Sequence, residues 1–485
     1  MASQFEQLHF LLIPLFSQSH IIPLTDFAKL LARQGPIVSI ITTPLNAKRY
    51  KKSLSDYALR ANLKIQLLPI PFPGQECGLP EGCENMDSLP SPGLARPFFD
   101  ACTLLQEPIQ NVAQKLEPKP SCIISSGAFT WTQNLAQNLG IPRYIFHTGS
   151  CFTLSCFDML SKSKVHESVA SDLDTFYLPD MPHKIECTRS QLPDFMTKNS
   201  LELKAIVDHM KEVDSLARGT LVNSFEELEP WYVAQHKKAN KNFWCIGPVA
   251  LANEEMEDKF RRGNETSIDK QKFCLKWLDS KEPGSVIYAC FGSMCHLSCM
   301  QLAEIGLGLE SSGRPFIWII RESDYSPDVD RWLKDNKFEE RVKGLVIRGW
   351  APQVLILSHP SVGGFLTHCG WNSIMEGICS GVPMITWPMF SEQFFNEMVV
   401  VNISSSGVKI GVSTAMKFAE ELNELVKREK IKAAIDQLMD DGEEGQEMRK
   451  RARKLGEMAT KSIEDGGSSH MNITLLIRDV MQQND

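Results

Sequence analysis

The sequence predicts an α/β fold made of two doubly wound domains, and three observations carry that prediction. Short apolar runs alternate with amphipathic stretches through the first 150 residues, the alternation breaks, and it resumes near residue 285. Strands that are buried on both faces of a parallel sheet are apolar throughout, so this rhythm favours open parallel sheets covered by helices. A chain of 485 residues is also long enough for more than one hydrophobic core.

The first rhythm begins with residues 8–16, a nearly continuous apolar run that predicts a buried strand. Residues 21–34 follow with helical spacing, and Gly35 with Pro36 ends that helix. Further strands are expected at residues 37–42, 65–70, 122–126 and 144–148.

The second rhythm starts after residues 252–269, a charged segment that we expect to be an exposed loop near a domain boundary. We predict an N-terminal domain of residues 1–248, a second domain of residues 249–465, and a C-terminal helix at 466–485 that packs back on the first domain. Two facing domains make a cleft, which is a favoured place for a ligand. Strands are expected at residues 285–293, 316–320, 345–348, 364–367, 383–387 and 408–412.

Composition excludes several classes of protein. Lys and Arg number 51 against 59 Asp and Glu, a net charge of −8, so a nucleic-acid partner is disfavoured. No apolar run reaches the roughly 18 residues of a membrane span, and the N-terminus does not resemble a signal peptide. The 14 cysteines form no CxxC pair, which favours free thiols in the cytoplasm over a zinc site. We expect a monomer without a metal.

A constellation of polar and aromatic residues lies in the second half, within residues 350–393. Residues 364–367 predict a strand, a tight turn follows, and Trp371 opens a helix; such a turn directs backbone N–H groups outward and makes an anion site. Gly370 keeps the turn open to a bulky phosphate. Additional donors for the anion are the side chains of His368, Asn372 and Ser373.

Other residues of this segment suit a sugar nucleotide. Trp350 can stack on a flat base, and Glu376 can accept hydrogen bonds from sugar hydroxyls, as acidic residues do for ribose. Glu392 and Gln393 place an acceptor beside a donor, which fits neighbouring hydroxyls of a hexose.

Taken together, residues 350–393 resemble the signature box of the plant family 1 UDP-dependent secondary-product glycosyltransferases. The resemblance extends over nearly the whole chain and includes IGPV at 246–249, CFGS at 290–293, VNSFEELE at 222–229 and GLPEGCENMD at 78–87. The last motif is similar to that of the flavonoid, lignan and triterpenoid group. The family implies a GT-B fold with two Rossmann-like domains, a UDP-sugar donor that is not tightly bound, and inversion at the anomeric carbon.

The resemblance also implies roles for individual residues. Glucose is the implied sugar, because Gln rather than His ends the box and Trp rather than Arg stands at 371. Trp350 would stack on uracil, Ala351 and Gln353 would read its edge, Glu376 would hold the ribose, Ser293, His368, Asn372 and Ser373 would bind the diphosphate, and Thr148, Trp371, Glu392 and Gln393 would bind the sugar.

His20 follows the first strand, at the sheet edge where doubly wound folds place ligands. An imidazole there can take a proton from the acceptor, and the family's catalytic His matches His20. The family normally orients this His with an Asp, but Ser126 stands at that position here. A hydroxyl cannot stabilise an imidazolium by charge, and losing the orienting carboxylate costs about 10⁴ in rate in serine proteases. Asp100 is another carboxylate considered for this role.

A weakly supported base favours an acidic acceptor, and a phenol, with a pKa near 10, gives up its proton far more easily than an alcohol. We therefore expect a phenolic acceptor such as a flavonoid. An electron-rich phenolate also attacks through ring carbon, so aromatic C-glucosylation is an open alternative. Triterpenoid or steroid O-glucosylation, and a catalytically weakened UDP-sugar-binding protein, are further alternatives.

Two weaker patterns concern a dinucleotide-binding motif and an apolar acceptor pocket. Residues 306–311 resemble the start of GxGxxG but lack its final Gly and lie within an amphipathic helix, which disfavours a nicotinamide oxidoreductase. The aromatic residues considered for an apolar acceptor pocket are Phe98, Phe152, Phe195 and Phe390.

Overall fold

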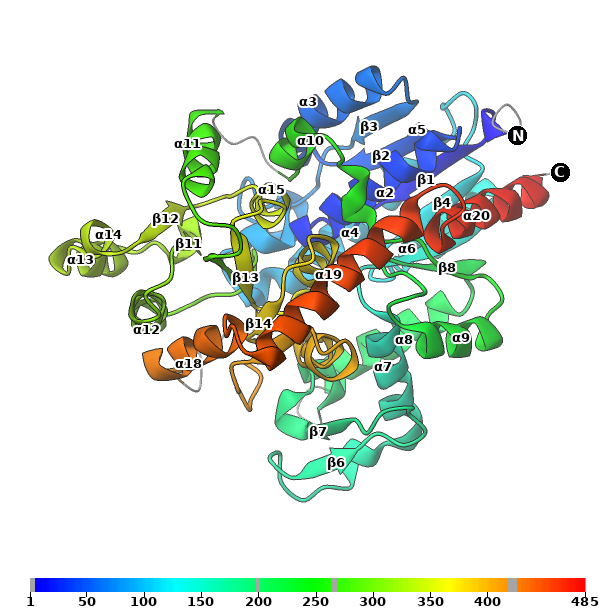
Figure 1. Cartoon of the computed structure of the whole chain (residues 1–485). Coiled ribbons are helices and arrows are strands. Elements are labelled where there is room, and N and C mark those ends of the chain that lie inside the picture. The colour runs from blue at the N-terminus through cyan, green and yellow to red at the C-terminus, as the bar shows by residue number, and fades with distance from the viewer. Residues whose placement is uncertain (1–4, 198–200, 264–267, 417–424, 485) are drawn as a thin grey trace. The chain divides into compact units, whose positions relative to one another are not determined.

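A computed structural model describes residues 5–197, 201–263, 268–416 and 425–484 (Figure 1). The chain forms two compact units, the first made of residues 1–151, 201–265 and 460–485 and the second of residues 152–200 and 266–459. Each unit contains a parallel sheet with helices, which confirms the α/β fold class. The boundaries predicted after residues 248 and 465 divide the chain in sequence order, whereas each unit combines separate segments; those boundaries remain a proposal.

Among the described residues, the first unit has a seven-stranded sheet in the order β3-β2-β1-β4-β5-β8-β9. Every neighbouring pair is parallel. The strands are β1 (His9–Ile13), β2 (Ile37–Thr42), β3 (Ile65–Pro69), β4 (Cys122–Ser125), β5 (Arg143–His147), β8 (Gly219–Val222) and β9 (Phe243–Cys245).

The core of the first unit includes the C-terminal helix. Phe10 of β1 and Phe27 of α2 (Gln18–Arg33) are fully buried in one cluster with Leu476 and Ile477 of α20 (Ser468–Asn484), the red helix of Figure 1. Asp479 of α20 also accepts a hydrogen bond from the Tyr144 hydroxyl at 2.6 Å. Residue 485 of the predicted C-terminal helix lies outside the described residues.

The prediction of an exposed loop at residues 252–269 is wrong for its described part. Met256–Arg261 forms a helix, α10, and its charges find partners on α2 and α3 (Pro44–Arg60). Asp258 pairs with Arg60, and Arg262 lies 2.6 Å from the buried carboxylate of Asp26. The charged composition therefore reflects ion pairing within the fold, which sequence cannot distinguish from solvation. Residues 264–267 lie outside the described part of the chain.

The second unit has, among its described residues, a six-stranded parallel sheet in the order β12-β11-β10-β13-β14-β15. A short antiparallel pair, β6 (Thr175–Tyr177) with β7 (Glu186–Thr188), stands apart from it. The sheet strands are β10 (Val286–Cys290), β11 (Phe316–Ile320), β12 (Gly344–Arg348), β13 (Val362–Thr367), β14 (Met384–Thr386) and β15 (Gly407–Lys409).

The GxG of residues 306–308 serves helix packing in α12 (Cys299–Ser311). A Cβ on Gly308 would lie 2.7 Å from Ile431 of α18 (Arg428–Leu438), and one on Gly306 would lie 3.0 Å from the ring of Trp332. These glycines allow close approach of neighbouring elements, which fits the sequence interpretation that rejected a dinucleotide fingerprint.

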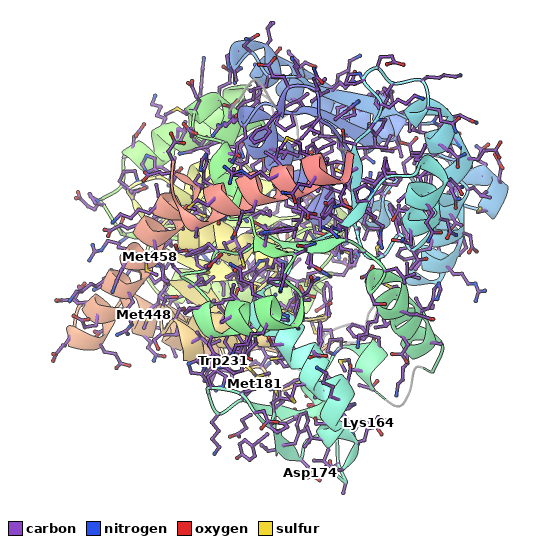
Figure 2. All side chains as sticks on the ribbon, turned by 90° about the vertical axis from the view of Figure 1, so that its right-hand side faces the viewer. Lys164, Asp174, Met181, Trp231, Met448 and Met458 are labelled. Carbon is purple, nitrogen blue, oxygen red and sulfur yellow. The ribbon has the colours of Figure 1, made fainter. Side chains whose placement is uncertain are left out.

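The long helix α19 (Glu443–Ile463) is buried along one side. Met448, labelled in Figure 2, is 4% exposed and joins the core of the second unit. The remaining α-helices are α4 (Ala95–Thr103), α5 (Gln106–Ala113), α6 (Trp131–Leu139), α7 (Cys151–Ser163), α8 (Leu201–Asp214), α9 (Pro230–Ala239), α11 (Ile268–Asp279), α13 (Pro327–Asp335), α14 (Phe338–Arg341), α15 (Gln353–Leu357), α16 (Trp371–Cys379) and α17 (Gln393–Met398).

Candidate functional site

In both sheets the order in which the chain adds strands reverses near the centre of the sheet. The predicted site residues follow the two strands on either side of each reversal. In the first sheet the chain builds outward from β1 to β3, then returns to β4 on the other side of β1. The second sheet does the same at β10 and β13. Ligands of doubly wound folds bind outside the carboxyl ends of such strands. His20 and Ser126 follow β1 and β4, and Ser293 and His368 follow β10 and β13.

His20 lies in the first turn of α2 and is surrounded by hydroxyl groups. Its Nδ1 lies 3.0 Å from Oγ of Ser17 and 3.1 Å from Oγ of Ser19, and these two oxygens are 2.9 Å apart. Its Nε2 lies 3.3 Å from Oγ1 of Thr148. A proton on Nδ1 donates to the serine oxygens and leaves the Nε2 lone pair to accept a proton.

The electrostatics around His20 favour the neutral ring. Burial, with a smaller contribution from neighbouring His147, lowers the pKa of His20 to about 4 from its usual 6.5. His20 is therefore unprotonated at neutral pH, as a base must be, but it is weaker than a histidine paired with a carboxylate.

Ser126 stands at the position of the Asp that orients the catalytic His in the family, but no hydrogen bond between Ser126 and His20 is found among the described residues. Its Oγ accepts a hydrogen bond from the backbone N–H of Ala128 at 3.3 Å, and its own N–H donates to the carbonyl of Ile13 at 3.2 Å. Among the described contacts of His20, the hydroxyls of Ser17 and Ser19 take the orienting place instead. Asp100 is exposed on α4 and has no described contact with His20.

The turn that carries His20 is fixed by a residue to which the sequence assigned no role. Asp87 accepts a hydrogen bond from the backbone N–H of Gln18 at 3.1 Å. The N–H of Met86 donates to the carbonyl of Phe16 at 2.9 Å. Asp87 ends the GLPEGCENMD motif, whose spacing signalled a family but not this long-range contact.

In the second unit, His368 is packed between two glycines at the turn after β13. A Cβ on Gly292 would lie 2.4 Å from Nε2 of His368, and one on Gly370 would lie 2.5 Å from the same atom. Burial, with a smaller contribution from Arg321, lowers the pKa of His368 to about 4, so the ring is neutral. Its Nδ1 is buried and has no hydrogen-bond partner among the described residues. Such an unsatisfied atom is suited to a ligand.

The predicted nucleoside residues meet at α15 and α16. Nε2 of Gln353 donates to Oγ of Ser373 at 3.1 Å and to a carboxylate oxygen of Glu376 at 2.7 Å. Ser373 and Glu376 are 8% and 5% exposed, so the cluster is shielded from water. Trp350 is half-buried, and within the described part of the chain its Nε1 has no partner. Ala351 is 8% exposed beside it in sequence.

The predicted sugar-binding pair lies at the start of α17. Oε1 of Gln393 accepts from the N–H groups of Met389 and Phe390, at 2.8 and 3.2 Å, which orients its amide N–H₂ group. Glu392 accepts from the Ser391 hydroxyl at 2.6 Å. The remaining predicted donor-site residues are Trp371, which is 2% exposed, and Asn372, which is half-buried at the N-terminus of α16.

Two further residues hold the turns after β10 and β13, which are the predicted UDP-sugar site, and neither was predicted from the sequence. We call the turn at residues 368–370 the donor turn. Arg321, at the end of β11, donates to the carbonyl of Ser293. Asn396 donates to the carbonyl of Cys369 at 3.0 Å and so ties α17 to the turn after β13. Both act on backbone atoms far away in sequence, which no local pattern reveals.

The four phenylalanines considered for an acceptor pocket are packed against other aromatic or apolar groups. Phe98 and Phe152 are fully buried, with ring centroids 5.7 Å from Phe72 and 6.3 Å from Phe395, respectively. Phe195 packs edge-on against Phe157 at 5.5 Å, and Phe390 is partly buried against the core of the second unit. Their role in binding an acceptor stays a prediction.

Two features of the described residues bear on metal ions and membranes. Among the described residues, no group of three or more His, Cys, Asp or Glu side chains is placed to hold a metal ion. No described helix is long and apolar enough to cross a membrane.

Comparison with known proteins identifies relatives over the whole chain. A sequence model described as UDP-glucoronosyl and UDP-glucosyl transferase matches residues 264–440. UDP-glycosyltransferase 73C3 of Arabidopsis thaliana is 48% identical over 481 residues, which are 98% of this chain and 96% of that protein. UDP-glycosyltransferase 73C25 of Barbarea vulgaris is 47% identical over 483 residues, covering 98% and 97% of the two chains.

Solved structures show the same similarity in three dimensions. UGT73P12 of Glycyrrhiza uralensis, complexed with glycyrrhetinic acid 3-O-monoglucuronide, gives a TM-score of 0.92 at 38% identity, covering 98% of this chain and 96% of that one. UGT71G1 of Medicago truncatula, complexed with UDP-glucose, gives a TM-score of 0.77 at 25% identity, covering 99% and 100%.

Proposed function

Because this chain belongs to the plant family 1 UDP-glycosyltransferases, enzymes with the GT-B fold, we propose that it transfers glucose from UDP-glucose to a phenolic hydroxyl, with His20 as the base. The observation that carries the proposal is a half-buried, neutral imidazole that, among the described residues, is held by hydroxyl groups instead of a carboxylate. The transfer of a sugar from a UDP-sugar to a small molecule follows from the family; the sugar, the base and the acceptor are proposed.

The donor side of the proposal uses the second unit. The buried Nδ1 of His368 and the N-terminus of α16 supply N–H donors for the diphosphate, and helix N-termini favour anions. Trp350 stacks on uracil, and Glu376, positioned by Gln353, holds the ribose hydroxyls. With these groups available, the leaving diphosphate is stabilised without requiring a metal ion.

Glucose is favoured by the residues at the sugar end. Gln393 has its carbonyl oxygen engaged by two backbone N–H groups, so its amide N–H₂ is available as a directed donor to a sugar hydroxyl. Glu392 supplies a carboxylate acceptor next to it. The neutral Trp371 offers no positive charge that would select a glucuronic acid carboxylate.

The chemical step is a single displacement. The acceptor oxygen forms a bond to the anomeric carbon while the bond from that carbon to the diphosphate oxygen breaks, and the configuration inverts. The acceptor proton passes to Nε2 of His20, whose Nδ1 proton is held by Ser17 and Ser19. UDP leaves with the electron pair of the broken bond.

The weak base selects the acceptor. A histidine with a pKa of about 4 and, within the described part of the chain, no carboxylate partner removes a proton from a phenol much more readily than from an aliphatic alcohol, because the phenol is many pKa units more acidic. The same argument keeps aromatic C-glucosylation open, since a phenolate carries negative charge on ring carbon as well as on oxygen. Flavonoids present both positions.

A triterpenoid alcohol is the second candidate acceptor, and one observation favours it. The relative with a TM-score of 0.92 was solved with a triterpenoid glucuronide. We further propose that the protein works as a monomer in the cytoplasm, where its 14 cysteines stay reduced.

The test is incubation with UDP-glucose and an acceptor panel of flavonoids, simple phenols and a triterpenoid alcohol, with products followed by mass spectrometry. Acid hydrolysis distinguishes linkages, since O-glucosides are cleaved and C-glucosides survive. UDP-galactose and UDP-glucuronic acid are tested in parallel as alternative sugar donors. Glucosides formed mainly on phenols support the proposal. Turnover only on the triterpenoid would overturn the acceptor assignment, and UDP-glucose binding without turnover would indicate a weakened binding protein.

A further inference from the structure

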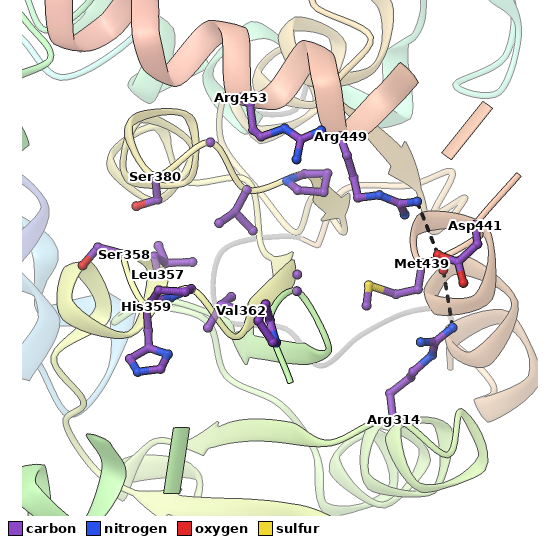
Figure 3. A pocket seen from close by; sticks show the side chains of 17 residues that line it. Arg314, Leu357, Ser358, His359, Val362, Ser380, Met439, Asp441, Arg449 and Arg453 are labelled. Atoms are coloured by element: carbon purple, nitrogen blue, oxygen red, sulfur yellow. Dashed lines mark hydrogen bonds and ion pairs between the residues drawn. The ribbon is translucent and has the colours of Figure 1, made fainter. Parts of the chain in front are cut away.

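The second unit contains a cavity that the donor chemistry does not use. It has a volume of about 490 Å³ and lies at the amino-terminal edge of the sheet, beside the residues that lead into β10, β13 and β14. The turns of the predicted UDP-sugar site follow the carboxyl ends of β10 and β13, so the cavity is at the opposite edge of the same sheet. Figure 3 shows it with its lining side chains.

Three arginines converge on this cavity. Arg449 and Arg453 extend from α19 on one side, and Arg314 extends from the other side, just before β11 (Figure 3). Arg449 and Arg453 lie one helical turn apart, and Arg314 lies more than 100 residues away in sequence, so the fold brings the three together.

The protein itself neutralises little of this charge. Among the lining residues the only carboxylate is Asp441, which lies 3.6 Å from Arg449 and whose side chain is 92% exposed. Water screens such an exposed pair strongly. Three guanidinium groups against one carboxylate leave an excess of positive charge at the cavity.

Helix capping accounts for only part of the arginines' hydrogen-bonding capacity. Arg314 donates to the carbonyl of Met439 at 3.4 Å, and Arg449 donates to the carbonyl of Leu438 at 3.4 Å, both at the C-terminus of α18. Favourable interaction of a cation with a helix C-terminus is expected. Each guanidinium carries five N–H donors, however, and the side chain of Arg453 makes no hydrogen bond or ion pair with the residues that the structure describes.

We propose that this cavity binds a small molecule with two or more adjacent anionic groups, phosphate or carboxylate. Guanidinium groups bind both through paired N–H donors, and two arginines on one helix face together with a third opposite match a ligand with at least two charged ends. The cavity volume falls within the range of small-molecule sites. This proposal is independent of the identity of the sugar acceptor and of the role of His20.

Strand β13 and helix α16 each reach from this cavity to the turn at residues 368–370, where the UDP-sugar is proposed to bind. Val362 lines the cavity at the start of β13, and His368 follows the end of that strand. Likewise, Trp371 begins α16 at the donor turn, while Ser380 at the other end of the helix lines the cavity. An anion bound here therefore contacts the same strand and helix that present the donor's diphosphate site.

The test is isothermal titration of the full chain with inorganic pyrophosphate and, separately, with citrate, in the presence of saturating UDP to occupy the donor site. We expect one saturable binding event per chain that weakens at least tenfold in the variant Arg449→Gln/Arg453→Gln. The matched control is Lys450→Gln/Lys454→Gln, which removes equal charge from exposed positions of the same helix and should bind as the wild type does.

Each arm of the experiment has a defined meaning. Binding of pyrophosphate alone identifies a phosphate ester as the ligand class, and binding of citrate alone identifies a polycarboxylate; either supports the site. Equal weakening in the arginine and lysine variants, or no saturable event with either probe, overturns it. If the double variant does not fold, Arg453→Gln alone decides, because this exposed side chain has no described hydrogen-bond or ion-pair partner to lose.

Discussion

Oγ of Ser17 lies 3.0 Å from Nδ1 of His20, and the Ser19 hydroxyl lies 3.1 Å from the same nitrogen. These two hydroxyls occupy the side of the ring that an orienting carboxylate takes in triads of acid–base residues. They hold the ring by hydrogen bonds but add no negative charge. The proposed base is thus oriented without being strengthened.

Replacing both serines tests this arrangement. We expect Ser17→Ala/Ser19→Ala to lower kcat roughly 10- to 100-fold, since the hydrogen bond from Nδ1 to the serine oxygens and the bond between the two hydroxyls, about 1 kcal/mol each, orient the imidazole. The KM for UDP-glucose should stay unchanged. The control is Ser163→Ala/Ser215→Ala, which removes two exposed hydroxyls that bond only to backbone atoms within four residues of them in sequence. A kcat equal to that of the control would show that the serines do not orient the base.

Asp87 provides a second test of how the base is positioned. Its carboxylate accepts from the N–H of Gln18, two residues before His20. We predict that Asp87→Ala lowers kcat about tenfold, because the first turn of α2 loses its anchor, with little effect on UDP affinity. Asp87→Asn keeps an oxygen acceptor and should restore most of the rate. If Asn and Ala reduce kcat equally, the anchoring role is wrong.

The pH dependence follows from the environment of His20. Because the pKa of His20 is lowered to about 4, the neutral base persists as pH falls from 8 to 6, and kcat/KM should decline only as pH approaches 4. Ser126→Asp should raise this pKa, since a nearby carboxylate stabilises the imidazolium, and move the acid limb upward by about a unit. The variant should also gain activity on aliphatic alcohols relative to phenols. A profile and acceptor preference identical to those of the wild type would refute the argument from the missing carboxylate.

The packing of His368 against glycine predicts the effect of one methyl group. In Gly370→Ala the new Cβ would lie 2.5 Å from Nε2 of His368, so the imidazole must move. We expect UDP affinity, measured by calorimetry, to fall tenfold or more. Gly93→Ala is the control, since the nearest heavy atom to its Cβ would lie 3.8 Å away. Unchanged UDP affinity in Gly370→Ala would exclude His368 from the donor site.

Much of the fold was predictable because buried parallel strands leave a strong local signal. The strands Ile37–Thr42 and Phe316–Ile320 were predicted with the bounds that the structure has. His20, however, lies inside the first turn of α2, which begins at Gln18, whereas the apolar spacing placed the helix start three residues later, at residue 21, because Gln18 and Ser19 carry no apolar signal.

The site was predictable where its residues share a local motif and unpredictable where they do not. The turn at His368 and the helix starting at Trp371 follow from contiguous sequence. Asp87, Arg321 and Asn396 contact backbone atoms that lie 69, 28 and 27 positions away, and only the fold brings them together. The ion pairs of α10 could not be predicted for the same reason: their partners are distant in sequence, and a charged segment without them resembles a solvated loop.

In the proposed reaction His20 removes the acceptor proton, and turnover of UDP-glucose by the variant His20→Ala tests this role. With a phenolic acceptor, we predict that UDP release falls 10²- to 10⁴-fold, the usual contribution of a general base. UDP affinity should match that of the wild type, and His209→Ala, an exposed histidine on α8, should keep full activity. Near-normal turnover by His20→Ala, with UDP still bound, would show that His20 is not the base.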